Sequence, residues 1–202
     1  MELPVNQYLV GDCLDIMKEW PDNCVDLIVT DPPYGINANK TTLGSGKHEF
    51  ERGGDWDNVK IDKVYFSEML RVSRDVAIWG GNYYTDILPP NNKWLIWHKL
   101  NDGLSFSEAE LAWTNYSMNT RVYSKYTASR VKQHPTEKPI EIIRWCLSLS
   151  KFEGIVCDPF ACSGTTALAC DELNRNWICI DIEQKYRDIA MKRLQGATIG
   201  LF

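Results

Sequence analysis

Val25-Asp26-Leu27-Ile28-Val29-Thr30-Asp31-Pro32-Pro33-Tyr34-Gly35 is the stretch around which this chain is organised. Its first six residues are mostly β-branched or aliphatic and have no helical period, which is typical of a strand buried on both faces. The two prolines end that strand, so Asp31 is predicted at its carboxyl end, the edge where ligands bind in open α/β sheets. Taken alone, the stretch fits an ordinary strand and proline turn as well as it fits a functional site.

Composition limits the class of protein. The chain has 202 residues, 44% of them hydrophobic, which is enough for one well-cored domain spanning residues 1–202. A net charge of -5 gives no global attraction to nucleic acid, so such a partner would need a local basic patch. Seven cysteines without a Cys-x-x-Cys pair and three scattered histidines form no zinc pattern, so we expect free thiols and no metal. Without a signal sequence or membrane-spanning run, we expect a soluble cytoplasmic protein.

Strand and helix patterns alternate along the chain, which indicates an α/β fold. The last third reads as strand, tight turn, helix and strand, a βαβ unit that implies a parallel sheet. Gly80-Gly81-Asn82 follows one strand at a point where a chain can approach a ligand closely. We expect strands at 8–10, 25–30, 76–79, 93–97, 110–114, 154–157 and 177–180. We expect helices at 13–20, 60–72, 139–149 and 186–194, and a further helix that follows the turn at 158–166 and ends at 173.

Two polar segments interrupt this pattern. The segment at about 35–59 is rich in glycine and is interpreted as a loop insertion beside the site, either functional or merely solvated. The segment from Arg121 to Lys132 carries four basic residues and no acid, interleaved with two tyrosines. Such a run neutralises phosphates and stacks on bases, or it is a solvated surface. The candidate DNA-binding residues are Arg121, Lys125, Arg130 and Lys132.

The C-terminal βαβ unit has the features of a nucleoside site. Its small-residue turn lets a ligand approach the backbone, and Asp181 ends the next strand, where an acid can accept two ribose hydroxyl bonds. The turn has neither the Gly-x-Gly-x-x-Gly pattern nor the Gly-Lys-Thr of a phosphate loop, which favours a nucleoside ligand without a pyrophosphate. An ordinary strand-helix junction is the alternative.

Three motifs in one order carry a family resemblance: Asp31-Pro32-Pro33-Tyr34, His134-Pro135-Thr136-Glu137-Lys138-Pro139 and Asp158-Pro159-Phe160-Ala161-Cys162-Ser163-Gly164-Thr165-Thr166. Together they resemble the permuted (beta-type) amino-group DNA methyltransferases, which use S-adenosylmethionine. The resemblance runs from Gly11-Asp12 to the final helix. It implies a single-domain, Rossmann-like methyltransferase fold with a mostly parallel central sheet and circularly permuted motif order. The family's turn usually reads Phe-x-Gly-x-Gly, whereas Cys162 replaces the first glycine here.

The resemblance also assigns site residues. Asp181 would hold the ribose of S-adenosylmethionine and Asp12 would lie near its adenine ring. The target base would be held by Asp31, Pro32, Pro33 and Tyr34. The whole set implied to bind the cofactor is Asp12, Asp31, Thr136, Lys138, Asp158, Phe160, Cys162, Ser163, Gly164, Thr165 and Asp181.

The chemistry explains why an acid, a proline and an aromatic ring stand together. The exocyclic amine of a base is a poor nucleophile because its lone pair is delocalised into the ring. An ionised Asp31 and the backbone carbonyl of Pro32 act only as acceptors, so they can bind the two amine hydrogens and draw the nitrogen toward tetrahedral geometry. Tyr34 offers a π-face for a base extruded from the duplex.

The resemblance favours double-stranded DNA as substrate and adenine as the target base, since an initial Asp in the tetrapeptide goes more often with adenine. The alternatives are a cytosine amino-group DNA methyltransferase, an RNA adenine methyltransferase, and a non-catalytic partner subunit that binds DNA and cofactor. Residues at about 98–133 stand where the family keeps its target-recognition region, which is short here. So little room for base readout suggests a short recognition site or a homodimer.

Overall fold

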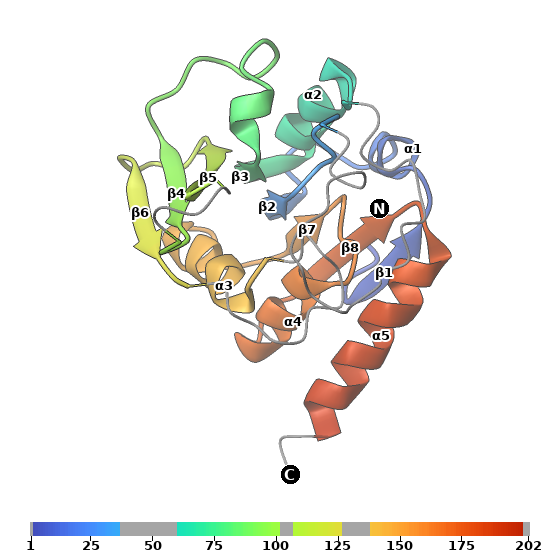
Figure 1. Cartoon of the computed structure of the whole chain (residues 1–202). Coiled ribbons are helices and arrows are strands. Elements are labelled where there is room, and N and C mark those ends of the chain that lie inside the picture. The colour runs from blue at the N-terminus through green and yellow to red at the C-terminus, as the bar shows by residue number, and fades with distance from the viewer. Residues whose placement is uncertain (1, 37–59, 102–106, 127–137, 200–202) are drawn as a thin grey trace.

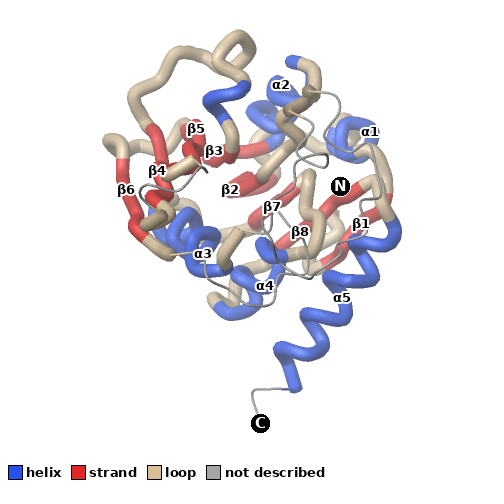
Figure 2. The backbone as a smooth tube through the Cα atoms, viewed as in Figure 1, coloured by secondary structure: helices blue, strands red, loops and turns tan. Residues whose placement is uncertain are grey.

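The computed structural model describes residues 2–36, 60–101, 107–126 and 138–199, and these build one mixed α/β domain around an eight-stranded sheet (Figures 1 and 2). The strand order is β1-β8-β7-β2-β3-β5-β4-β6. The strands are β1 (Gln7–Val10), β2 (Val25–Thr30), β3 (Ser73–Trp79), β4 (Trp94–His98), β5 (Ala109–Thr114), β6 (Arg121–Ser124), β7 (Val156–Asp158) and β8 (Trp177–Asp181).

The expected mostly parallel sheet is confirmed. Strands β1, β8, β7, β2 and β3 pair in parallel, as do β4 and β6, whereas β5 runs antiparallel to both β3 and β4. Strand β2 lies in the middle, with Ile28 opposite Val76 on one side and Cys157 on the other. The two strands that precede Asp-Pro, β2 and β7, are therefore neighbours, and their carboxyl ends meet at one edge.

Helices cover both faces of the sheet and make three layers (Figure 1). Neighbouring residues of β2 point to opposite faces: Leu27 and Val29 belong to one apolar cluster and Ile28 to the other. The first cluster packs under α3 (Ile140–Leu149), α4 (Thr165–Glu172) and α5 (Gln184–Ile199). The second packs under α1 (Cys13–Met17), α2 (Lys63–Val72) and the segment with Tyr84 and Leu88 that follows the short 3-10 helix η2 (Gly81–Tyr83).

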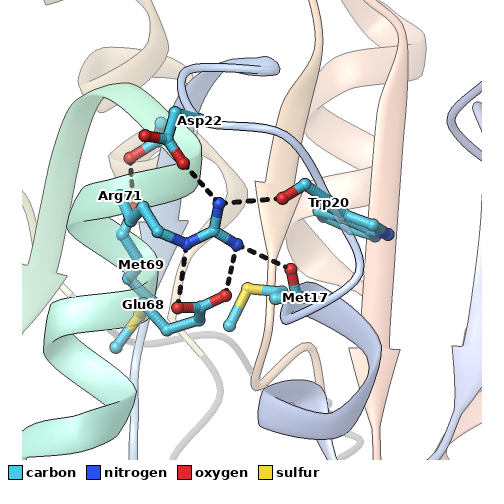
Figure 3. A network of polar contacts seen from close by, with 7 residues as sticks. Met17, Trp20, Asp22, Glu68, Met69 and Arg71 are labelled. Carbon is cyan, nitrogen blue, oxygen red and sulfur yellow. Dashed lines mark hydrogen bonds and ion pairs between the residues drawn. The ribbon is translucent and has the colours of Figure 1, made fainter. Parts of the chain in front are cut away.

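Helix α1 is shorter than expected, because it ends at Met17 rather than near Trp20. Arg71 of α2 explains how the chain beyond α1 is held (Figure 3). Its guanidinium donates to the backbone carbonyls of Met17 (3.0 Å) and Trp20 (2.8 Å) and pairs with Asp22 and Glu68. One planar fork thus binds the carbonyl at the end of α1 and a second carbonyl just beyond it, and it joins this segment to α2.

Other boundaries also differ from the expectations. Helix α5 is longer than predicted at both ends, and β3 begins at Ser73. Strand β6 was not predicted; it pairs with β4 at the edge of the sheet, so the described part of 98–133 contributes two strands to the central sheet.

The motif order of the chain is a sequence property, and its circular permutation stays a prediction. Most of the 35–59 insertion, with Thr136, Arg130 and Lys132, lies outside the described residues.

Candidate active site

A cavity of about 500 Å³ opens at the carboxyl ends of the parallel strands. Residues that follow β1, β2, β7 and β8 line it, so the four strand ends converge on one space. Its volume is within the range of small-molecule sites, roughly 300 to 1,000 Å³. The lining includes Gly11, Asp12, Asp31, Pro33, Ile61, Tyr65, Trp79, Lys138, Asp158, Phe160, Cys162, Ser163, Thr165, Asp181, Ile182 and Tyr186.

Asp158, at the end of β7, is buried and fully engaged. It accepts hydrogen bonds from Thr30 Oγ1 (2.8 Å), Thr166 Oγ1 (2.6 Å) and the backbone N–H of Phe160 (3.1 Å). Burial raises the pKa of Asp158 to about 6, although these hydrogen bonds oppose the rise. Its contacts join β2, β7 and α4, so Asp158 shapes the cavity wall.

The turn after β7 explains why glycine is usual where Cys162 stands. Cys162 has φ of 44°, in the left-handed region that glycine adopts most readily, and Gly164 has φ of 76° where α4 begins. The Cys162 carbonyl accepts from the Tyr8 hydroxyl at 2.6 Å. Burial, and after it the Asp181 carboxylate, raises the pKa of Cys162 to about 12, so its thiol is neutral at physiological pH.

Asp181 and Asp12 lie at the ends of β8 and β1 and face the cavity. Asp181 Oδ2 accepts from the Cys162 N–H and Oδ1 from the Glu183 N–H, both at 2.9 Å. One lone pair on each oxygen is thereby used, and the others are available for ligand hydroxyls. Asp12 caps α1 through Leu14 N–H (2.8 Å) and accepts from the Tyr65 hydroxyl at 2.9 Å.

Asp31 is the centre of a charged cluster. Its Oδ1 accepts from the Tyr34 hydroxyl, and its Oδ2 accepts from the Lys138 ammonium group. Lys138 also pairs with Glu110 of β5 at 3.2 Å, and Glu110 pairs with Lys99 at 2.7 Å. Burial raises the pKa of the Asp31 carboxyl, with Glu110 adding to the rise and Lys138 opposing it. The Asp31 side chain is 30% exposed, so a ligand can reach it.

Tyr34 is fixed from two sides. Its ring stacks on Tyr83 with centroids 4.7 Å apart and planes 17° apart, and a Cβ at Gly80 would overlap the same ring. The preceding carbonyl, that of Pro33, accepts a hydrogen bond from the Tyr84 hydroxyl. The Gly80-Gly81 turn therefore makes the close approach that the sequence indicated, here to an aromatic side chain.

The structure brings most of the predicted cofactor residues to the cavity. Nine of the eleven line it; Gly164 caps α4 instead, and Thr136 lies outside the described residues. Of the predicted base-binding residues, Asp31 and Pro33 line the cavity, whereas Pro32 and Tyr34 do not. Lys138 lines it as well, but its ammonium group contacts Asp31 and Glu110.

The predicted phosphate contacts are only partly described. Arg121 is exposed on the edge strand β6, and Lys125 pairs with Glu141 at 2.8 Å. Among the described residues, no group of three His, Cys, Asp or Glu side chains could hold a metal ion, and no helix is long and apolar enough to cross a bilayer. All seven cysteines are free thiols.

Sequence reasoning missed several residues of the site. Glu110 of β5 shares Lys138 with Asp31, and Lys99, just beyond β4, pairs with Glu110; no local motif marks either residue. The sequence also gives no sign of Tyr83, which stacks on Tyr34, or of Tyr65, which donates to Asp12. The pairing of β5 with β3 and β4 brings Glu110 and Lys99 to this edge of the sheet, whereas Tyr65 comes from α2 and Tyr83 from η2.

Comparison with solved methyltransferases defines the class of fold. The chain is similar to M1.HpyAVI, solved as a complex with SAM, at 25% identity and a TM-score of 0.62, over 93% of this chain and 98% of that one. It shares its fold, at 14% identity and a TM-score of 0.62, with the PvuII DNA methyltransferase, which is cytosine-N4-specific; 92% of this chain and 84% of that one are covered.

Sequence comparison identifies the family. The N6/N4 DNA methylase family model matches residues 81–192. Type II methyltransferase M.HinfI of Haemophilus influenzae is 27% identical over 95% of this chain and 68% of that protein. The chain belongs to the DNA methylase family, and it is a DNA methyltransferase of the amino-group class.

Proposed function

We propose that the cavity binds S-adenosylmethionine and that the protein methylates the exocyclic amine of adenine in DNA, with Asp31 as the residue that receives the amine. The convergence of four strand ends on one cavity of about 500 Å³, with Asp31 at its edge, carries this proposal. The cavity has the size, the strand-end acids and the aromatic lining that suit a nucleoside with an amino-acid tail.

The residues present fit that cofactor. Asp181 has free lone pairs for ribose hydroxyls, and Asp12, Tyr65 and Ile182 offer polar and apolar contacts for an adenine ring. The turn from Phe160 to Thr165 would hold the methionine end. S-adenosylmethionine supplies a methyl group made electrophilic by its positively charged sulfur.

The remaining chemistry is positioning. Asp31 Oδ1 and the carbonyl of Pro32 would accept the two hydrogens of the amine, so that the nitrogen lone pair leaves conjugation and can attack the methyl group. The Tyr34 hydroxyl now occupies Asp31 Oδ1. An incoming amine would replace it, and Tyr34, extended by Tyr83, would present an aromatic surface to the base. No covalent enzyme intermediate is required.

Adenine is favoured over cytosine by the initial Asp of Asp31-Pro32-Pro33-Tyr34. The fold does not discriminate, because the cytosine-N4-specific PvuII enzyme shares it. We further propose that residues 98–133 contribute to target recognition, that Arg121, Lys125, Arg130 and Lys132 contact phosphates, and that two copies act as a homodimer.

The test uses labelled S-adenosylmethionine with duplex DNA, followed by chromatography of the nucleosides. We expect N6-methyladenine from the native protein and at least a roughly 100-fold loss of rate in Asp31→Ala and Asp31→Asn, because both remove the charged acceptor. Asp188→Ala, an exposed acid on α5, is the matched control and should retain the native rate.

Each outcome decides between the alternatives. N4-methylcytosine as product would overturn the choice of base, and labelling of RNA but not DNA would overturn the substrate. Equal rates in native protein and Asp31→Ala would reject the role of Asp31. Cofactor and DNA binding without any methyl transfer would identify a non-catalytic partner subunit.

A further inference from the structure

Lys138 is a buried cation beside the candidate active site, and it lies between two carboxylates. Its side chain is 6% exposed, and its ammonium group contacts two carboxylates, Asp31 Oδ2 and Glu110 Oε2. The same group lies 5.2 Å from the centroid of the Trp79 ring, which forms an aromatic wall beside it. A buried ammonium group is costly unless it is paired, and here it is paired twice.

The four charges form a row that starts on two strands and ends at the cavity. Lys99, just beyond β4, pairs with Glu110 of β5, Glu110 pairs with Lys138, and Lys138 pairs with Asp31. The side chains of Lys99 and Lys138 are 18% and 6% exposed, so solvent screens these pairs less than a surface pair. The row therefore links Asp31 electrostatically to Lys138 and Glu110, which lies in the antiparallel part of the sheet.

We infer that Lys138 is a positioning residue that orients Asp31 and keeps its carboxylate charged, and that Glu110 limits this effect by sharing the Lys138 ammonium group. The inference rests on the proposed function, in which a charged Asp31 receives the amine. Lys138 holds Oδ2, which leaves Oδ1, now bonded to the Tyr34 hydroxyl, as the oxygen that would receive the amine. Without the cation, a carboxylate in this partly desolvated place would hold a proton more readily.

The charges around Asp31 set the sign of each effect. Burial raises the pKa of Asp31, Glu110 raises it further, and Lys138 and the Tyr34 hydroxyl lower it. Asp158 and Cys162 also face this region from β7 and the turn beyond it. Burial tends to lower the pKa of Lys138, but Asp31 and Glu110 outweigh it, so Lys138 stays protonated. Removing Lys138 or Glu110 should thus move the Asp31 titration in opposite directions.

The first experiment is a pH profile of single-turnover methyl transfer in the full chain. Lys138→Met should move the acid limb upward by about one to three pH units, since a nearby opposite charge shifts a carboxyl pKa by that much. Glu110→Gln should move it downward, because the neutral amide leaves Lys138 to Asp31 alone. The acid limb of Lys138→Arg should lie at nearly the same pH as that of the native protein, because the charge is kept. Lys192→Met, an exposed site on α5, is the matched control and should leave the profile unchanged.

The second experiment reads ionisation without activity. Titration of ¹³Cγ-labelled aspartate by NMR, with the Asp31 signal assigned through Asp31→Asn, should show the same opposite shifts in Lys138→Met and Glu110→Gln. The inference would be overturned if the rates of Lys138→Met and Glu110→Gln fell by the same factor at all pH values, with the acid limb of each profile and the titration of Asp31 unchanged. An increase in the dissociation constant of S-adenosylmethionine as the main effect of Lys138→Met would overturn it too, because Lys138 would then act on the cofactor.

The two measurements separate this inference from the proposed function. If the native protein transfers no methyl group but the opposite NMR shifts occur, the function is wrong and the charge network holds. If methyl transfer occurs and Asp31 titrates alike in all variants, the function holds and the network has no role in ionisation.

Discussion

Asp31 and Asp158 show how residues with the same local sequence acquire different environments. Each follows a buried strand and precedes a proline, and the two strands are neighbours. Asp158 is buried and uses both oxygens on Thr30, Thr166 and the Phe160 N–H. Asp31 is partly exposed and is held by a cation and a phenol. Of these two residues, Asp31 is therefore the one that combines a reachable oxygen with a charged neighbour, which suits it to receive an amine.

Gly80 is predicted to control the position of Tyr34. It has φ of 67°, and a Cβ there would overlap the Tyr34 ring. Gly80→Ala should displace the ring and lower the rate of methyl transfer by roughly 10- to 100-fold, since small misplacements at a reacting centre cost that much. Binding of S-adenosylmethionine, measured by calorimetry, should persist because neither Gly80 nor Tyr34 lines the cavity.

Gly196→Ala is the matched control for this change. A Cβ at Gly196, in α5, meets nothing within 4 Å, and the helix favours alanine. We expect native activity and a gain in stability of up to about 1 kcal/mol. A Gly80→Ala variant as active as Gly196→Ala would show that the Tyr34 position is not critical.

At the scale of elements, the Arg71 fork is predicted to hold α1 against α2. Arg71→Met should cost about 2 to 3 kcal/mol in the free energy of unfolding, because it removes charge-assisted bonds to the Met17 and Trp20 carbonyls. Arg71→Lys should lose less, since it keeps the charge but not the planar fork. Urea denaturation measures both, and a change under about 0.5 kcal/mol in Arg71→Met would contradict the prediction.

The elements themselves were mostly predictable from sequence. Apolar runs such as 25–30 and 177–180 indicate strands because their side chains suit a sheet covered on both faces. Strand β6 escaped prediction because Arg121–Ser124 is short and three of its four residues are exposed; its pairing with β4 decides its structure. Helix α1 ends at Met17, earlier than the apolar pattern through Trp20 indicates, and Arg71, distant in sequence, binds the carbonyls of Met17 and Trp20.

At the scale of the whole molecule, the net charge of -5 opposes binding to DNA, so local basic groups must provide it. Arg121 is exposed on β6, whereas Lys125 is paired with Glu141. Arg121→Gln should lower the slope of log affinity against log salt by about 1, and Lys125→Gln by less. Binding to duplex DNA over a salt series, with Lys192→Gln as control, tests this. Equal slopes in all variants would remove Arg121 from the interface.

The sequence alone determined the α/β class, the mostly parallel character of the sheet and the residues at the carboxyl ends of its strands, because hydrophobic period and proline breaks act locally. It also carried the resemblance to amino-group DNA methyltransferases, which the family comparison confirms. The tertiary structure alone decided which residues surround Asp31. Lys138 lies just before α3, and Glu110 lies in β5. Such a charge network forms only when segments far apart in sequence pack at one edge of the sheet.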